Sequence, residues 1–498
     1  MQLIDAWTRL DNGLKAFEPV WRPQPFRLVT QSIATSNAWQ HPLHERALEL
    51  DEPTFQTLFN DGSNNNAMLY DWIQDVFVDL TNTSSTDSSG DDQNEGHSVA
   101  MVQLQYQAQL FGSMVDVLQE LPTQQAGDIF QPPSYSGRTQ PREANGVPGR
   151  KWEQVEAFSR LVPEGSNPIV DWCSGKGHLA RWMHTSTCTC EIRGRPVHCL
   201  EIDQNLVRSG ELLTKKQKSI PQNGGIEFYE HDVLTDPLPS NLEGTDYTHT
   251  ALHACGELHR TALVAAATQQ ARAVVVVPCC YEKHFGVASN SDSDTIYHTF
   301  RPLSDVANKH TSLSITRDDL FLAVADGVVT ASAKEAKVRE KEMAWRLAFD
   351  LWRTDIQLKL GTSDDQMFSS TSEYPTVHVP SAPYRLLAED DFALFLRHCV
   401  MSKGRSSAAR KRLEPALNAA LTNGSRVLLE DYAVRGEELR LRVERLELVR
   451  RAFQRPFEMW LATDYGLFLE EKGYQVDLRT LCDRSITPRN IAIVAQRL

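Results

Sequence analysis

A short loop with two glycines follows an apolar run that has the length of a buried strand. The run NPIVDWC contains Asp171 and Cys173, and Gly175 and Gly177 come next, ahead of a segment with helical spacing. Glycine lets a backbone approach a ligand closely, and the first N–H groups of a helix lack intrahelical partners. The loop therefore suits the polar part of a ligand. It lacks the third glycine of a dinucleotide-binding loop and the Ser or Thr that follows the lysine of a Walker A loop.

Acidic residues follow three successive predicted strands. Asp171 ends the first strand, Asp203 follows the second and Asp232 follows the third. An adenosine ligand that lies across the strand ends needs an acceptor for its ribose hydroxyls after the second strand and a polar contact for adenine after the third. S-adenosylmethionine also carries an ammonium and a sulfonium group, which an acid near Asp171 would suit. The competing interpretation is that the three aspartates only cap helices.

Residues suited to proton transfer or nucleophilic attack follow the next two predicted strands. His253 and Cys255 come after the fourth strand, and Cys279, Cys280 and Tyr281 come after the fifth. If the ligand of the glycine loop is a methyl donor such as S-adenosylmethionine, the reaction is an in-line displacement at carbon, and the protein mainly positions the acceptor and removes its proton. His253 titrates in the useful range and is the candidate base. Tyr281 is the candidate to stack on, or hydrogen-bond, a planar acceptor.

The cysteines allow three interpretations. A thiolate among Cys255, Cys279 and Cys280 would attack a base, as in cytosine-C5 methyltransferases. The same residues, with Cys188, Cys190 and nearby histidines, would hold zinc, although the chain lacks two Cys-x-x-Cys pairs. Small thiols packed at crowded strand ends account best for most of them. The sequence therefore predicts no metal site.

Strands that alternate with helices must position all these residues. Strand patterns such as PVHCLEID and ARAVVVVP are separated by helix patterns such as QNLVRSGELLTKKQ. This order predicts a parallel sheet covered on both faces, with the ligand at the carboxyl ends of the strands. GYQVDLRTLC and NIAIVAQRL predict a C-terminal β-hairpin that completes the sheet. We therefore expect a doubly wound, Rossmann-like α/β fold.

Five motifs stand in a characteristic order along this region. They are Asp-x-Cys-x-Gly-Lys-Gly-His, Leu-Glu-Ile-Asp, His-Asp, Leu-His-Ala-Cys-Gly-Glu-Leu and Pro-Cys-Cys-Tyr. Their combination resembles a class I S-adenosylmethionine-dependent methyltransferase family that contains uncharacterised bacterial methyltransferases and the eukaryotic methyltransferase-like protein twenty-five group. The resemblance covers about residues 148–330, returns at 446–450 and 487–490, and is weak or absent over 1–121.

The resemblance implies roles for the matching residues. Asp171, Cys173, Gly175 and Gly177 would form the loop that binds the methionine part of the cofactor, with Cys173 where most class I enzymes have glycine. The ribose and adenine contacts follow the second and third strands; they are Asp203, with Glu201 as the alternative two residues earlier, and Asp232 with Val233.

The predicted activity is S-adenosylmethionine-dependent methyl transfer to RNA or protein. The alternative is a catalytically inactive methyltransferase-fold protein that acts in binding or as a scaffold. A nicotinamide-dependent oxidoreductase is disfavoured because the third glycine of the loop is missing.

The chain divides into five predicted segments. They are a helical N-terminal domain (1–121), a polar linker (122–149), the cofactor-binding methyltransferase core (150–330), a helical insertion or cap (331–455) and a C-terminal helix with the hairpin (456–498). The helical insertion includes a basic stretch, residues 403–455, with 13 Lys/Arg against 7 Asp/Glu. Its helical spacing favours a solvated helix face over a nucleic-acid contact.

Composition places the chain in a broad class. Hydrophobic residues make up 41% and charged residues 23%, as in ordinary globular proteins. The sequence shows no apolar run near the ~20 residues of a membrane span and no secretory signal. Nine cysteines, an odd number, indicate reduced thiols. We therefore expect a soluble, cytoplasmic protein with no membrane partner.

Overall fold

The computed structural model describes most of the chain. The described residues are 1–25, 41–60, 66–86, 94–122, 147, 151–184, 194–217, 225–244, 246–283, 300–325, 333–359, 384–388, 391–401, 407–422 and 426–498. Cys188, Cys190 and nearly all of the predicted linker lie outside them. The predicted domain boundaries stay predictions.

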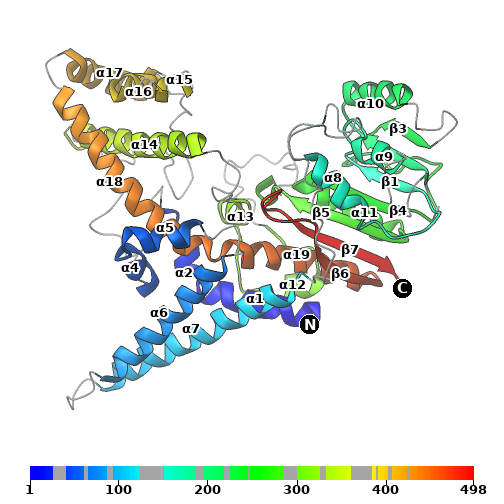
Figure 1. Ribbon diagram of the computed structural model, residues 1–498, viewed down its shortest axis with the longest axis horizontal. Coiled ribbons are helices and arrows are strands. Elements are labelled where there is room, and N and C mark those ends of the chain that lie inside the picture. Colours follow the sequence, from blue (N-terminus) through cyan, green and yellow to red (C-terminus); the bar gives the residue numbers. More distant parts are fainter. Residues whose placement is uncertain are drawn as a thin grey trace.

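The described residues form one seven-stranded sheet in the order β3-β2-β1-β4-β5-β7-β6 (Figure 1). The strands are β1 (Ile169–Trp172), β2 (Val197–Glu201), β3 (Ile226–Glu230), β4 (Thr248–Cys255), β5 (Ala273–Cys279), β6 (Tyr474–Thr480) and β7 (Ile491–Arg497). The first five strands pair in parallel, whereas β7 pairs antiparallel with both β5 and β6. The C-terminal hairpin thus completes the sheet, and the Rossmann-like arrangement expected from the sequence is confirmed.

Apolar side chains cover both faces of the sheet. In β5, Val274 and Val276 belong to the core on one face, and Val275 and Val277 belong to the core on the other. This alternation follows from the strand period of two residues, so a strand buried on both faces is apolar throughout. The helices α8 (Lys151–Ser159), α9 (His178–Met183) and α10 (Gln204–Lys216) pack on one face, and α11 (Glu257–Thr268) and α19 (Gln454–Glu471) pack on the other.

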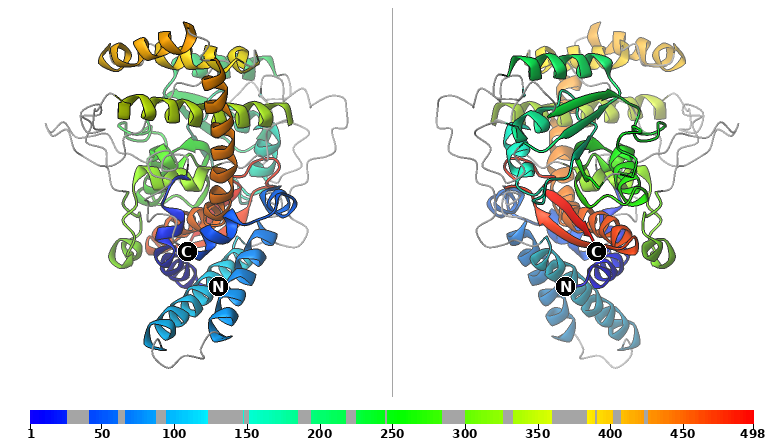
Figure 2. Two further views of the ribbon diagram at one scale, coloured as in Figure 1. Left: turned by 90° about the vertical axis from the view of Figure 1, so that its left-hand side faces the viewer. Right: turned by 90° about the vertical axis from the view of Figure 1, so that its right-hand side faces the viewer.

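The N-terminal helices pack against one another, α18 and α19, and share a core with α19. They are α1 (Leu3–Ala16), α2 (Glu18–Trp21), α4 (Pro42–Leu48), α5 (Glu52–Asn60), α6 (Ala67–Thr86) and α7 (Asn94–Glu120). Phe17 of the N-terminal segment contacts Phe111 of α7 and Phe453 next to α19, with ring centroids 5.8 and 5.2 Å apart. Asp11 of α1 accepts a hydrogen bond from Trp460 Nε1 at 3.0 Å. In both views of Figure 2, α6 and α7 project from the body of the molecule as an antiparallel pair.

A second group of helices surrounds a core of its own, away from the sheet (Figure 1). Two short helices, α12 (Asp305–His310) and α13 (Arg317–Val324), precede it. The group consists of α14 (Ala333–Lys359), α15 (Tyr384–Ala388), α16 (Phe392–Met401), α17 (Ser407–Thr422) and α18 (Arg426–Arg451). Its core includes Trp345, Phe349 and Phe395. None of the helices that the structure describes is long and apolar enough to cross a bilayer.

Arginines of α18, within the basic stretch, take part in ion pairs of the fold. Arg440 pairs with Glu437 and Glu444 on the same helix. Arg445 pairs with Glu52 of α5 at 2.8 Å, which joins the basic stretch to an N-terminal helix. Part of the charge therefore stabilises α18 itself, and the Arg445 pair joins two helices.

A buried histidine in β4 makes the stability of the fold sensitive to acid. His249 is fully buried, its ring centroid lies 4.8 Å from that of Trp172, and neither ring nitrogen has a hydrogen-bond partner among the described residues. Burial lowers the pKa of His249 to about 3. Below about pH 6.5, His249 is therefore protonated in the unfolded chain but not in the folded chain, so the free energy of unfolding decreases as the pH falls.

We expect His249→Leu to reduce this loss. Between pH 7.5 and 5, the wild type should lose about 2 kcal/mol through this one group, at about 1.4 kcal/mol per pH unit below pH 6.5. The variant should lose that much less, measured by urea unfolding at both pH values. His310→Leu, at an exposed histidine, is the matched control and should follow the wild type. An unchanged pH dependence in His249→Leu would show that His249 is protonated in the folded protein.

Candidate functional site

The loop after β1 adopts a left-handed backbone at three positions. Cys173, Gly175 and Gly177 have φ of 57°, 57° and 67°. A Cβ at Gly177 would lie 2.6 Å from the ring of Phe228, so close packing requires glycine there, whereas a Cβ at Gly175 would meet nothing within 4 Å. Gly177 is tied to the sheet, and Gly175 borders open space. The two glycines thus lie in one loop but differ in role, because Gly177 allows close packing and Gly175 leaves space beside the backbone.

Glu201 fixes this loop to the end of β2. Its Oε2 accepts a hydrogen bond from Gly175 N at 2.9 Å, and its Oε1 accepts one from Asp203 N at 3.0 Å. Glu201 is buried, whereas the side chain of Asp203 is exposed and caps α10 by accepting from Asn205 N at 2.8 Å. Of the two candidate ribose acceptors, the structure therefore places Glu201, and not Asp203, beside the glycine loop.

Asp171 lies under the loop as a buried acid. Asp171 is 3% exposed, and no described residue donates a hydrogen bond to its carboxylate. Burial, followed by the negative charge of Glu201, raises the pKa of Asp171 to about 7. Burial likewise raises the pKa of the neighbouring Cys173 thiol to about 12. The site thus holds two acids close together, and a cation beside Asp171 would stabilise its charged form.

The segment after β3 adjoins the same region. His231 N donates to the carbonyl of Glu201 at 2.9 Å, which joins the ends of β2 and β3. Asp232 is half-buried, and its carboxylate accepts from Leu234 N at 3.0 Å in a local turn. The side chain of Val233 is buried in the core. The ends of β1, β2 and β3 therefore present Asp171, Glu201 and Asp232 at one edge of the sheet.

His253 stands where β4 becomes irregular. The pairing of β4 with β5 shifts between Leu252 and Cys255, and His253 has a φ of 67°. Its Nε2 is buried without a hydrogen-bond partner among the described residues. Burial, followed by the positive charge of Lys151, lowers the pKa of His253 to about 4. The imidazole is therefore neutral at pH 7 and able to accept a proton.

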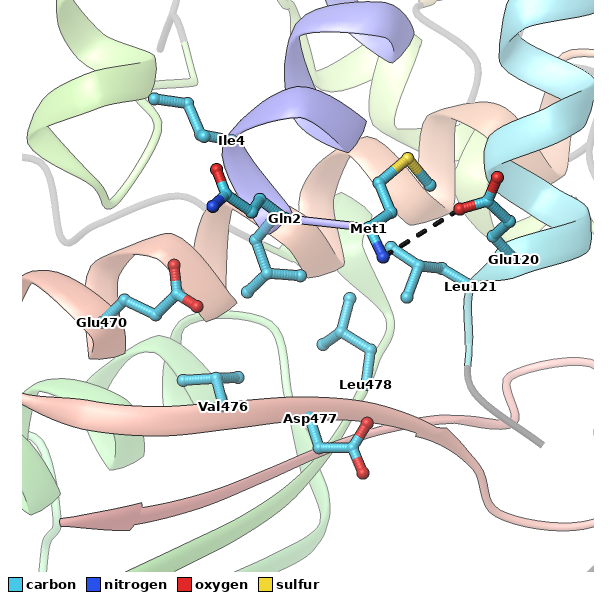
Figure 3. Close-up of a pocket in the computed structure, with 10 residues that line it drawn as sticks. Met1, Gln2, Ile4, Glu120, Leu121, Glu470, Val476, Asp477 and Leu478 are labelled. Atoms are coloured by element: carbon cyan, nitrogen blue, oxygen red, sulfur yellow. Dashed lines mark ion pairs between the residues drawn. The ribbon is translucent and has the colours of Figure 1, made fainter. Parts of the chain in front are cut away.

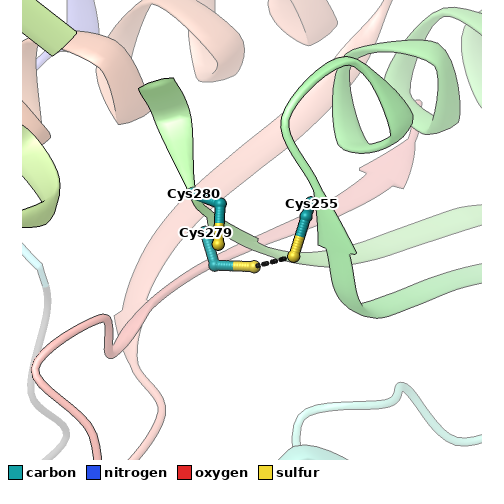
Figure 4. Close-up of side chains that lie close together, drawn as sticks. All are labelled: Cys255, Cys279 and Cys280. Atoms are coloured by element: carbon teal, nitrogen blue, oxygen red, sulfur yellow. Dashed lines mark hydrogen bonds between the residues drawn. The ribbon is translucent and has the colours of Figure 1, made fainter. Parts of the chain in front are cut away.

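Three cysteines meet at the ends of β4 and β5 (Figure 4). The Sγ atoms of Cys255 and Cys279 lie 3.3 Å apart, and all three sulfurs, including that of Cys280, lie within 4.8 Å of one another. A hydrogen bond with Cys255 is the largest cause of the raised pKa of Cys279 and also of the lowered pKa of Cys280. Among the three thiols, Cys280 is therefore the one whose ionised form the cluster favours.

Tyr281 does not lie at the surface where an acceptor would bind. Its side chain is fully buried. Its ring stacks on that of Tyr465 of α19, with centroids 6.4 Å apart, and contacts the edge of His259 at 5.6 Å. The physical reason is that the short helix η4 (Tyr281–Lys283) turns back toward the α13 and α19 side of the sheet. This position supports packing between β5 and α19, and not the stacking on a planar acceptor that the sequence predicts.

Two basic residues lie beside Cys280, and the sequence predicts no role in the site for either of them. Lys283 follows Cys280 along the chain, and Arg489 comes from the connection between β6 and β7, and the charge of each acts on Cys280. The Arg489 guanidinium also donates to the carbonyl of Val324 at 2.8 Å. The sequence feature that could have indicated Arg489 is the Thr487-Pro488-Arg489-Asn490 segment. This segment lies near the end of β5 because β7, which follows it, pairs with β5.

A pocket of about 450 Å³ lies apart from these residues. It is bordered by α1, α7, α19 and β6 (Figure 3), with lining residues that include Leu3, Glu120, Glu470, Val476 and Leu478. β6 is the edge strand, so β4, β5 and β7 separate the pocket from β1 and the glycine loop.

The match of one segment to a known family supports methyl transfer in general. A family described as a methyltransferase domain matches residues 150–284, the segment that carries β1 to β5, the glycine loop and the cysteine cluster. The solved structure of the type I restriction-modification system methyltransferase subunit from Streptococcus thermophilus is 10% identical, with 57% of this chain and 77% of that chain covered and a TM-score of 0.19. No curated protein matched. The narrower grouping with methyltransferase-like protein twenty-five stays a prediction.

Proposed function

We propose that the protein is an S-adenosylmethionine-dependent methyltransferase. The observation that carries the proposal is the contact between Glu201 and Gly175. It holds a buried carboxylate at the end of β2 against the glycine loop at the end of β1, where ligands of open α/β sheets bind. The match of residues 150–284 to a methyltransferase domain supports the same reaction class.

The residues present fit this cofactor. Gly175 borders open space, so the loop backbone is accessible to the methionine part. Asp171 offers a buried carboxylate with no donor among the described residues, which suits an ammonium or sulfonium group because a nearby cation favours the charged acid. S-adenosylmethionine, when bound, supplies the electrophilic methyl group.

The adenosine contacts follow from the next two strand ends. Glu201 already accepts hydrogen bonds from Gly175 and Asp203, and each carboxylate oxygen has a further lone pair for a ribose hydroxyl. We assign adenine to Asp232 and Val233 after β3. Because the Val233 side chain is buried, its contact would come from the backbone.

The acceptor is proposed to lie against the ends of β4 and β5. We assign to His253, whose imidazole is neutral at pH 7, the proton that the acceptor loses. Cys255, Cys279 and Cys280 border the same surface. The acceptor classes proposed are RNA and protein.

Titration calorimetry of the full chain tests the cofactor. We expect micromolar binding of S-adenosylmethionine and of S-adenosylhomocysteine, at one site per chain. A labelled methyl donor, incubated with RNA and with protein fractions, then identifies the acceptor. A folded chain that binds neither ligand would overturn the proposal and favour the scaffold alternative.

A further inference from the structure

The cysteine cluster brings together thiols from two neighbouring strands. Cys255 of β4 and Cys279 of β5 are register partners in the parallel pair. Cys280 follows directly, and the three sulfurs lie within 4.8 Å of one another. Figure 4 shows the side chains of Cys255 and Cys279 pointing toward each other, with Cys280 beside them.

The backbone holds this arrangement through two exceptional positions. In an extended strand, adjacent residues such as Cys279 and Cys280 would point to opposite faces. Cys280 instead has a φ of 49°, which turns its thiol toward the same cluster. Gly256 N donates to the carbonyl of Cys279 at 3.3 Å, and a Cβ at Gly256 would lie 2.5 Å from the carbonyl oxygen of Lys283. Only glycine therefore lets the chain segments after β4 and β5 approach so closely.

The spacing of the three sulfurs suits a thiophilic cation. Tetrahedral zinc binds thiolates at about 2.3 Å, which places its sulfurs about 3.8 Å apart. The observed separations, from 3.3 Å between Cys255 and Cys279 to at most 4.8 Å, bracket that value. Lys283 and Arg489 add positive charge beside Cys280, and this charge would offset part of the negative charge of three thiolates.

We propose that Cys255, Cys279 and Cys280 bind one Zn²⁺ ion with three protein ligands. The described part of the chain offers no fourth side-chain ligand to the cluster. Cys255 and Cys280 are half-buried, so solvent reaches the group and the fourth position is open to water or to a substrate atom. Three protein ligands and one open position are the pattern of a reactive zinc site, as opposed to a closed structural one.

A disulfide between Cys255 and Cys279 is the competing chemistry for the same contact. It would use only these two thiols and leave Cys280 free. Zinc requires all three. Cys280→Ser therefore separates the two, and replacing the half-buried Cys280 disturbs packing less than replacing the buried Cys279.

The test is the metal content of the full chain, purified with a thiol reductant and without chelator. We expect close to one zinc per chain in the wild type and at least a tenfold loss in Cys280→Ser, because even residues that only support the ligands of a metal site contribute about 10- to 100-fold to metal affinity. Cys399→Ser, at a buried cysteine of α16, and the double variant Cys188→Ser/Cys190→Ser should keep the wild-type content.

Cobalt provides a second readout that does not depend on a variant that folds. The stripped wild-type chain, titrated with Co²⁺, should give the charge-transfer and visible bands of a tetrahedral thiolate site, saturating at one equivalent. Zinc-free wild type without cobalt bands, zinc content unchanged by Cys280→Ser, or a Cys255–Cys279 disulfide under these reducing conditions would overturn the proposal. Neither measurement uses a methyl donor, so the result is independent of the proposed function.

Discussion

Replacement of Glu201 by glutamine should weaken the binding of S-adenosylmethionine and S-adenosylhomocysteine alike. The carboxylate accepts backbone hydrogen bonds through both oxygens, and the amide would turn one of these acceptors into a donor facing an N–H group. A hydrogen bond to a charged group contributes about 1.5–3 kcal/mol, so we expect a loss of roughly 10- to 150-fold in affinity. Both ligands should lose equally because they share the ribose.

Asp203→Asn is the matched control for this experiment. It removes the same charge two residues away, and asparagine still caps the start of α10. The Asp203 side chain is exposed, and its carboxylate accepts from Asn205 N. The affinities of Asp203→Asn for both ligands should therefore stay within about threefold of those of the wild type, as expected for a screened surface charge. Titration calorimetry on both variants, with thermal unfolding to show that each is folded, decides between the two acids. A large loss in Asp203→Asn with none in Glu201→Gln would reverse the assignment.

The periodicity of the sequence predicts the sheet but not the direction of single side chains. Alternating helix and strand patterns, with the terminal GYQVDLRTLC and NIAIVAQRL segments, are enough to predict the sheet and the returning hairpin. Glu201 and Asp203 have the same charge and differ by one strand period. Which of them faces the loop depends on where β2 ends and α10 begins, and helix ends are the least determined part of a sequence pattern.

Backbone conformation explains what the sequence could not indicate at the end of β5. Tyr281 is polar-tipped and follows a strand, as acceptor-binding aromatics do, yet η4 buries it against Tyr465. The positive φ of Cys280 is a non-glycine exception that no residue preference signals. It places two adjacent cysteines, which would point to opposite faces of a regular strand, in one cluster with Cys255. The sequence gives no sign of this turn, so it favours packed thiols and predicts no metal site.

Asp171→Asn should have opposite effects on stability and on binding. In the wild type without ligand, the folded chain keeps the Asp171 proton up to about pH 7, whereas the unfolded chain releases it near pH 4. This group's contribution to stability is therefore present at low pH and is lost as the pH rises from about 4 to 7, at about 1.4 kcal/mol per unit. Asparagine has no such proton to lose. The ligand-free variant should be the more stable protein at pH 8, by up to about 4 kcal/mol, with the difference narrowing toward pH 4.

Binding should fall in the same variant because the cation of the ligand loses its counter-charge. S-adenosylmethionine, with its sulfonium, should lose more affinity than S-adenosylhomocysteine, whereas Glu201→Gln affects both equally. Near pH 6.5 the wild type should also release a proton on binding, since the ligand's cation favours the ionised form of Asp171. Calorimetry in buffers of different ionisation enthalpy measures that proton, and it should be absent from Asp171→Asn.

Urea unfolding of the ligand-free proteins at pH 5 and pH 8 completes the test. If Asp171→Asn is less stable than the wild type at pH 8, the ionised Asp171 stabilises the ligand-free loop. That result would contradict our interpretation of Asp171 as a buried acid that receives no hydrogen bond. The expected combination, a gain in stability with a loss of binding, is the signature of a charge kept at a cost for a cationic ligand. It also separates Asp171 from Glu201, whose two backbone hydrogen bonds hold the loop whether or not the ligand is bound.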